Sequence, residues 1–202
     1  MSRDLSLATL AVGLAFATTG LASRASGTIS GTVTVSGATS NANAVVYVTQ
    51  VAGTLSKSTT PAQLDQSKMQ FSPHVLAIVA GTSVKFLNGD PTAHNVFSPD
   101  NEKYNLGTWP QGQTKDYVFD KCQTFPCVYR QLCRVHPEML GYIVVLQNPY
   151  FAVTAKDGTY EIKDVPPGSY QLDVWHEKAK ASPQPVTVDA TKPAVVNFTL
   201  KK

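Results

Sequence analysis

The sequence has few charged residues, few cysteines and no strongly basic segment. Charged residues make up 15% of its 202 positions, and the formal net charge is +3. The lysines and arginines are not clustered or interleaved with aromatic residues, which argues against nucleic-acid binding. Hydrophobic residues make up 43%, and 13 glycines and 13 prolines supply turns. This composition predicts a β-rich globular protein and argues against a disordered chain or a helical bundle.

Motifs of the common enzyme classes are also missing. The sequence contains no HExxH metalloprotease motif, no phosphate-binding P-loop, no glycine-rich nucleotide turn and no recognisable Ser/His/Asp set. We therefore predict that the protein is not an enzyme.

The N-terminus holds the only long apolar stretch. Arg3 gives a positive start, residues 5–21 are mostly apolar, and Ala22 or Ala25 is a plausible cleavage position. We predict that residues 1–25 are a signal peptide, so that the protein is periplasmic or secreted. The alternative is a membrane anchor, but polar residues interrupt a stretch that is barely long enough to span a bilayer. We expect no membrane span in the mature chain.

Three cysteines are an odd number for an oxidising compartment. Cys122 and Cys127 are separated by four residues and can pair, which leaves Cys133 as the lone thiol. Such a thiol is easily oxidised unless it is buried or bound to a metal. Two alternatives stay open: Cys133 could be a buried, inert residue, or Cys127 could approach the metal and favour zinc or Cu(I) storage.

The sequence around Cys133 places three metal-binding side chains at three-residue steps. Cys133, His136 and Met139 offer a thiolate, an imidazole and a thioether. A trigonal set of one Cys and two His with a weak axial Met is typical of a blue-copper electron-transfer centre. His94 is the candidate for the second imidazole. Alternatively, Met139 could be core packing, and Glu138 could supply an axial oxygen instead.

Alternation of apolar and polar residues predicts short strands along the whole chain. The predicted strands lie at residues 27–35, 44–48, 71–79, 83–88, 114–119, 127–133, 141–146, 150–154, 160–162, 169–175, 185–188 and 194–200. Residues 53–68 are polar and read as a linker, and residues 98–113 read as a loop. Short strands at this spacing predict sandwiches or barrels.

Residues 69–148 resemble a cupredoxin domain of the plastocyanin or amicyanin kind. The resemblance rests on the following motifs: Phe71-Ser72-Pro73, Gly81-Thr82-Ser83-Val84, Phe86-Leu87-Asn88-Gly89-Asp90, His94-Asn95-Val96 and the Cys-x2-His-x2-Met run. It implies a Greek-key sandwich that holds one copper ion by His94, Cys133, His136 and Met139. It also implies that Asn95 hydrogen-bonds across to the loop that carries the thiolate.

The two flanks, residues 26–52 and 150–202, together resemble one carboxypeptidase-regulatory-like or transthyretin-like β-sandwich. The resemblance rests on β-rich sequence with Asp157-Gly158 and Pro167-Gly168 turns. Neither flank alone has enough strands to cover an apolar face. We therefore predict an all-β fold in which a cupredoxin sandwich is inserted into a second, smaller sandwich, at the kind of surface site where insertions are tolerated. This arrangement resembles methylamine-utilisation-type periplasmic proteins.

These observations together predict a periplasmic type 1 (blue) copper protein that carries single electrons between redox protein partners. A monomer that binds no nucleic acid is expected. Two other functions are compatible with the same residues: copper trafficking or storage, and an interaction module in which the metal is only structural.

Overall fold

The computed structural model describes residues 25–52 and 61–202. This part of the chain consists of seventeen β-strands joined by turns and loops, without a helix, which confirms the predicted all-β fold. Within these ranges no helix is long and apolar enough to cross a membrane. The predicted signal peptide, except for Ala25, lies outside the described residues.

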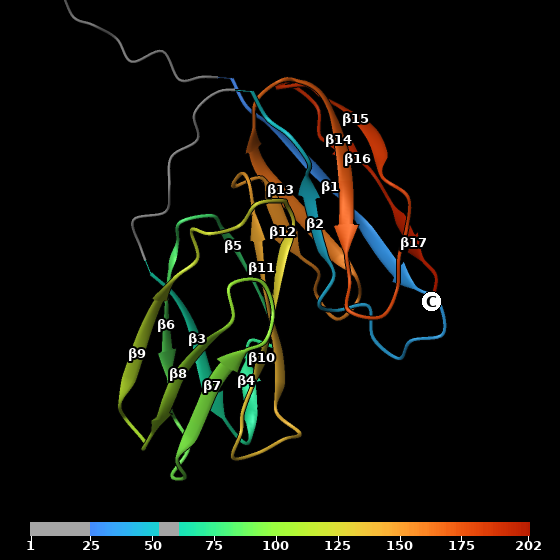
Figure 1. Cartoon of the computed structure of the whole chain (residues 1–202). Coiled ribbons are helices and arrows are strands. Elements are labelled where there is room, and N and C mark those ends of the chain that lie inside the picture. Colours follow the sequence, from blue (N-terminus) through green and yellow to red (C-terminus); the bar gives the residue numbers. More distant parts are fainter. Residues whose placement is uncertain (1–24, 53–60) are drawn as a thin grey trace, which may run out of the picture.

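The strands form four sheets that pack as two sandwiches (Figure 1). The central sandwich contains β3 (Ala62–Ser67), β4 (Gln70–Ser72), β5 (Val75–Val79), β6 (Ser83–Leu87), β7 (His94–Ser98), β8 (Tyr104–Trp109), β9 (Thr114–Val118), β10 (Cys127–Leu132) and β11 (Leu140–Leu146). Its sheets have the strand orders β4-β3-β6-β9 and β5-β11-β10-β7-β8.

The flanking sandwich combines the first two strands with the last six. It contains β1 (Gly27–Val35), β2 (Val45–Val48), β12 (Phe151–Val153), β13 (Thr159–Val165), β14 (Gly168–Trp175), β15 (Gln184–Val188), β16 (Ala194–Val195) and β17 (Phe198–Leu200). Strand β1 pairs with β13, β16 and β17, while the second sheet has the order β12-β2-β14-β15. The strands before residue 49 therefore pair only with strands that follow residue 150.

Residues 62–67 form strand β3, so the segment predicted as a linker, residues 53–68, is a strand at its C-terminal end. Strand β3 runs parallel to β6, with Leu64 opposite Phe86. The inward-facing positions are Leu64 and Gln66, both with no exposed surface. The amide of Gln66 donates a hydrogen bond to the Leu87 carbonyl. Because one of the two buried positions is polar, the alternation that marks a half-buried strand is hidden in the sequence.

Strand β8 lies within residues 98–113, which the sequence predicted as a loop. Only its two end residues, Tyr104 and Trp109, are buried, and Gly107 has a φ of 83°. Its pairing with β7 is also irregular between Asn95 and Phe97. A strand with so few inward-facing apolar residues gives no alternating pattern.

Strand β11 is buried on both faces, which joins the two sandwiches through a shared apolar layer. Ile143 and Val145 face the core of the central sandwich. Val144 and Leu146 face the opposite way, into a cluster with Val45 of β2. A continuous apolar run without alternation is the pattern expected for a strand covered on both sides. The flanking sheet β12-β2-β14-β15 is thus packed directly on the central sandwich.

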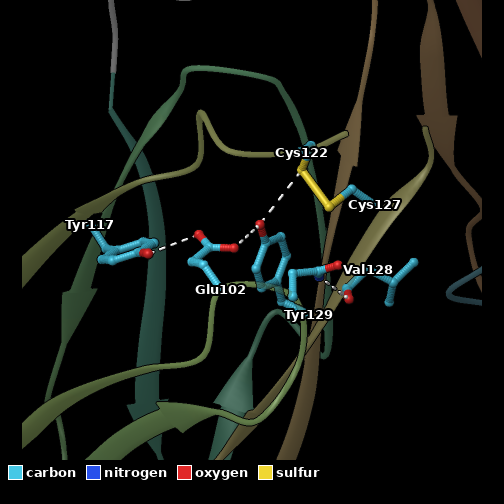
Figure 2. Close-up of a disulfide and its surroundings, with 7 residues drawn as sticks. Glu102, Tyr117, Cys122, Cys127, Val128 and Tyr129 are labelled. Carbon is cyan, nitrogen blue, oxygen red and sulfur yellow. Dashed lines mark hydrogen bonds between the residues drawn. A yellow bond between two sulfur atoms is a disulfide. The ribbon is translucent and has the colours of Figure 1, made fainter. Parts of the chain in front are cut away.

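A disulfide between Cys122 and Cys127 closes the connection from β9 to β10, as predicted (Figure 2). Two residues into β10, the Tyr129 hydroxyl donates a hydrogen bond of 2.6 Å to Glu102. Tyr117 of β9 donates a second one of 2.8 Å to the same carboxylate. The beginning of β10 is therefore held by a covalent link and by a shared carboxylate.

Replacing Glu102 with glutamine is expected to lower the free energy of unfolding by about 1–3 kcal/mol at neutral pH, because hydrogen bonds to a charged acceptor are lost. Burial acts to raise the pKa of Glu102, but hydrogen bonds from Tyr129, Tyr117 and the backbone together with the charge of Lys121 outweigh it, so the pKa lies below its usual value. A lowered folded-state pKa stabilises the protein above the unfolded-state pKa of about 4.3, and this contribution is lost as the pH falls through the folded-state value.

Urea unfolding of both proteins at neutral and acidic pH measures this effect. The difference in free energy of unfolding between wild type and Glu102→Gln should shrink in acid. Glu161→Gln is the control and should have little effect at either pH, because Glu161 is paired with Lys163 on the exposed surface. A difference that stays constant with pH would contradict the assigned role of the Glu102 charge.

Candidate metal centre

Three of the four predicted ligands meet at one end of the central sandwich. His94 is the first residue of β7, and Cys133 directly follows β10. His136 lies in the ligand loop, residues 133–139, which connects β10 to β11 at the lower end of the view in Figure 1. One donor atom from each of these residues lies within 4.8 Å of the other two. The strand order places β7 beside β10, which brings His94 next to the loop.

The donor atoms are spaced as the ligands of one metal ion would be. Cys133 Sγ is 3.9 Å from His94 Nδ1 and 3.8 Å from His136 Nδ1, and the two nitrogen atoms are 2.9 Å apart. These separations define a point about 2.1 Å from all three atoms, close to the ~2.0–2.3 Å at which nitrogen and thiolate ligands bind a transition metal. The residues therefore fit a single small ion with one sulfur and two nitrogen ligands.

Asp90 fixes the orientation of the His94 ring. Its Oδ2 atom lies 3.0 Å from His94 Nε2, and His94 is completely buried. With Nε2 carrying the proton for this contact, Nδ1 keeps its lone pair for a metal. Asp90 belongs to the Phe86-Leu87-Asn88-Gly89-Asp90 motif, four residues before His94 in a Gly-Asp-Pro turn, but the sequence predicted no role for it at the metal centre.

Two backbone amides hold the Asp90 carboxylate in place. Lys68 N donates to Oδ1 at 2.6 Å, and Met69 N donates to Oδ2 at 2.8 Å. The hydrogen bond from Met69 lowers the pKa of Asp90; burial opposes it, while the bonds from Lys68 and His94 act in the same direction, and the net shift is downward. Lys68 and Met69 both have a positive φ, 56° and 59°. They form the two-residue turn between β3 and β4, a conformation that usually requires Asn or Gly. Asp90 thus caps a turn that the two residues disfavour.

Asn95 connects β7 to the ligand loop. Its backbone amide donates to Cys133 Sγ at 3.4 Å, and its side-chain oxygen accepts from the Arg134 amide at 3.4 Å. Its side-chain nitrogen donates to Asn105 Oδ1 and to the Gly107 carbonyl at 2.9 and 2.7 Å. An amide directed at a thiolate stabilises its negative charge and fixes its position.

The ligand loop buries Met139 and leaves Glu138 exposed. Met139 is 1% exposed and packs in the same apolar cluster as Cys133. Its amide donates to the His136 carbonyl at 3.0 Å, which forms a turn. The exposed Glu138 does not share this buried position. Among the predicted ligand residues His136 is the one that reaches the surface, where it is half-buried beside the exposed Val135.

The remaining histidine and cysteine side chains of the described ranges lie away from this centre. Cys122 and Cys127 are joined to each other, so Cys133 is the free cysteine. His74 lies 3.4 Å from Glu177 at the contact between the two sandwiches. The alternative in which Cys127 acts as a second thiolate ligand does not apply to this structure.

Comparison with known proteins identifies two kinds of relative. Residues 141–201 match the family model of the carboxypeptidase regulatory-like domain. Among curated proteins no match is found. The matched segment is about a third of the chain and begins within β11, a strand of the central sandwich.

The similar solved structures include cupredoxins and a copper-containing nitrite reductase. A purple cupredoxin from Nitrosopumilus maritimus is 27% identical, with 42% of this chain and 98% of that chain covered and a TM-score of 0.37. A copper-containing nitrite reductase (NirK) from Thermus scotoductus SA-01 is 26% identical. The match covers 48% of this chain but only 24% of the reductase chain, and its TM-score is 0.39. Amicyanin from Paracoccus versutus is 21% identical. The match covers 50% of this chain and 96% of the amicyanin chain, and its TM-score is 0.38. The comparisons thus return cupredoxins and a carboxypeptidase regulatory-like domain, the two families that the sequence resembles.

Proposed function

We propose that this protein is a type 1 copper protein that carries single electrons between redox protein partners outside the cytosol. The observation that carries the proposal is the convergence of His94 Nδ1, Cys133 Sγ and His136 Nδ1 on one point. Met139, which is buried in the same apolar cluster as Cys133, would be the fourth and weakest ligand. A copper ion held there would supply a one-electron Cu(II)/Cu(I) couple.

The protein's contribution is to keep the ligands in one arrangement in both oxidation states. His94, Cys133 and Met139 are almost completely buried, so water has little access to the centre. Hydrogen bonds to Asp90 and Asn95 fix the His94 ring and the Cys133 sulfur. Soft sulfur suits Cu(I) and imidazole suits Cu(II), so a fixed mixed set serves both with little rearrangement. Small rearrangement is the property that a carrier of electrons requires.

Electrons would reach the centre through His136. Its half-buried ring joins the buried donors to the surface, and the neighbouring Val135 is 47% exposed. A redox partner could therefore dock over this part of the ligand loop and exclude water from it. If His94, Cys133, His136 and Met139 all bind the metal, no position would be left for a substrate, which favours a carrier over an enzyme.

The disulfide favours electron transfer over copper storage. A storage site with Cys127 as a second thiolate would need that thiol free, but Cys122 and Cys127 are bonded to each other, which leaves one thiol at the centre. The N-terminal signal predicted for residues 1–25 would place the protein in an oxidising compartment, where such a disulfide persists.

The first test is to add Cu(II) to the mature protein and record its absorption spectrum and voltammogram. We expect an intense visible band from thiolate-to-copper charge transfer and a reversible one-electron reduction. Cys133→Ser should lose the band, because the sulfur ligand is gone. A double variant, Cys122→Ser with Cys127→Ser, should keep it. A colourless complex that cannot be reduced reversibly would reject the proposal and favour storage or a structural metal.

A further inference from the structure

The flanking sandwich contacts the strand that leaves the ligand loop. Strand β11 begins at Leu140, immediately after Met139, and Tyr142 is its third residue. Strand β14 of the flanking sandwich ends at Trp175, and Glu177 lies in the turn that follows. These two residues reach the central sandwich at Tyr142, three residues from Met139.

Aromatic rings from both sandwiches enclose the Tyr142 side chain. The Trp175 ring lies 5.3 Å from it, between centroids, at an interplanar angle of 59°. The His74 ring lies 5.5 Å away and is nearly perpendicular, at 81°. The Tyr142 amide also donates to the His74 carbonyl at 2.8 Å. Aromatic pairs at these distances and angles are stabilising beyond the area that they bury.

Glu177 adds a charged contact to the same residues. Its Oε1 atom is 3.4 Å from His74 Nε2 and 3.4 Å from Lys178 Nζ, and its side chain is only 13% exposed. Burial raises the pKa of Tyr142, and the charge of Glu177 and a hydrogen bond to it add to the rise. The other charged or titratable groups near this cluster are His176 on the same turn and Arg130 and Asp100, which face Tyr142 from the central sandwich.

The beginning of β11 has little room to adjust. A side chain at Gly141 would meet Phe71 Cβ at 2.7 Å and approach the His74 carbonyl. Tyr142 is paired with Arg130 of β10 on one side and with Val75 of β5 on the other. Leu132 and Leu140, the residues on either side of the ligand loop, are paired with each other. Both ends of the loop are therefore fixed to the same position of the β10–β11 ladder. A shift of β11 therefore moves Met139 relative to Cys133.

We propose that Trp175 and Glu177 are positioning residues for the ligand loop: they hold Tyr142 and thereby fix the start of β11 and the place of Met139 relative to Cys133. The inference rests on the proposed function for its effect on copper. It gives the flanking sandwich a role at the metal centre, although it contributes none of the predicted ligands.

Hydrogen exchange of backbone amides in the metal-free protein tests the positioning directly. In Trp175→Leu, the amides of Met139 and Tyr142 should exchange about three- to tenfold faster, the factor that corresponds to losing an aromatic pair. Trp175→Phe should retain most of the protection, because it keeps a ring against Tyr142. Glu177→Gln should also speed exchange, whereas Glu161→Gln, on the exposed surface of β13, should not.

The copper-loaded variants provide the second measurement. Trp175→Leu and Glu177→Gln should shift the reduction potential and the visible band, while Trp175→Phe and Glu161→Gln should leave both near the wild-type values. Unchanged exchange and an unchanged band in Trp175→Leu and Glu177→Gln would overturn the inference. If wild-type protein shows no visible band but exchange responds as expected, the proposed copper function fails while the positioning of the loop stands.

Discussion

Replacing Asp90 with alanine is expected to weaken copper binding about 10- to 100-fold, the usual cost of losing a residue that orients a metal ligand. The His94 ring would lose the partner of its Nε2 atom, 3.0 Å away. The ring could then turn, and the proton could move to Nδ1, the nitrogen that faces Cys133 and His136. Competition titration against a chelator of known copper affinity measures the change.

The same substitution should destabilise the metal-free protein by about 2–4 kcal/mol, because charge-assisted hydrogen bonds to buried groups are among the stronger ones. Lys68 N and Met69 N would both lose their acceptor in a turn with two positive φ values. Urea unfolding in the presence of a chelator measures this loss of stability separately from the loss of copper affinity. A loss of copper affinity without a loss of stability would mean that Asp90 acts on His94 but does not support the turn.

Asp65 supplies the matched control for this prediction. Its Oδ1 atom accepts a hydrogen bond of 3.0 Å from the Gly89 amide, in the same turn as Asp90. Within the described residues it forms no hydrogen bond or ion pair with His94, so Asp65→Ala should reduce stability modestly and leave copper affinity within a few-fold of wild type. Equal losses of affinity in both variants would show that any disturbance of this turn is sufficient, and that the contact between Asp90 and His94 has no special role.

The local part of the metal centre was predictable from sequence, and the cupredoxin resemblance indicated Asn95, but the role of Asp90 in orienting His94 was not predictable. Cys133, His136 and Met139 share one loop, so their spacing alone predicts that they meet. His94 could be added by elimination among the histidines and by its neighbours in the His94-Asn95-Val96 motif. Asp90 receives its hydrogen bonds from residues 21 and 22 positions earlier, and no short motif encodes such a contact. The Lys-Met turn that supplies them has no turn-forming residue to mark it.

The arrangement of the two sandwiches was predictable only in part. Regular alternation identified most strands, yet β3, β7 and β8 were missed because buried polar or sparse apolar positions obscured their period. The apolar run of β11 indicates burial on both faces, but it does not identify what covers the outer face. That covering is supplied by β2, β12 and β14, from segments on either side of the central sandwich in the sequence.

Truncating Leu146 to alanine is expected to lower the free energy of unfolding by about 2–5 kcal/mol, the range for large-to-small changes at buried sites. Leu146 is 1% exposed and packs in the shared layer with Val45 and Tyr47 of the flanking sandwich. Because this layer is apolar and lies against strands of both sandwiches, we expect them to unfold together. Calorimetry of the metal-free protein should therefore show one transition, shifted to lower temperature in the variant.

Val195 provides a contrast for the shared layer, since it is 69% exposed on β16. Val195→Ala should change stability by no more than about 0.5 kcal/mol, as is usual for surface positions. Two separate transitions, of which Leu146→Ala moves only one, would mean that the sandwiches are independent units joined by their connections. In that case a contact at Trp175 could not fix the ligand loop, because the flanking sandwich could move away from Tyr142 without unfolding. A single transition is thus the condition under which the flanking sandwich can act on the metal centre.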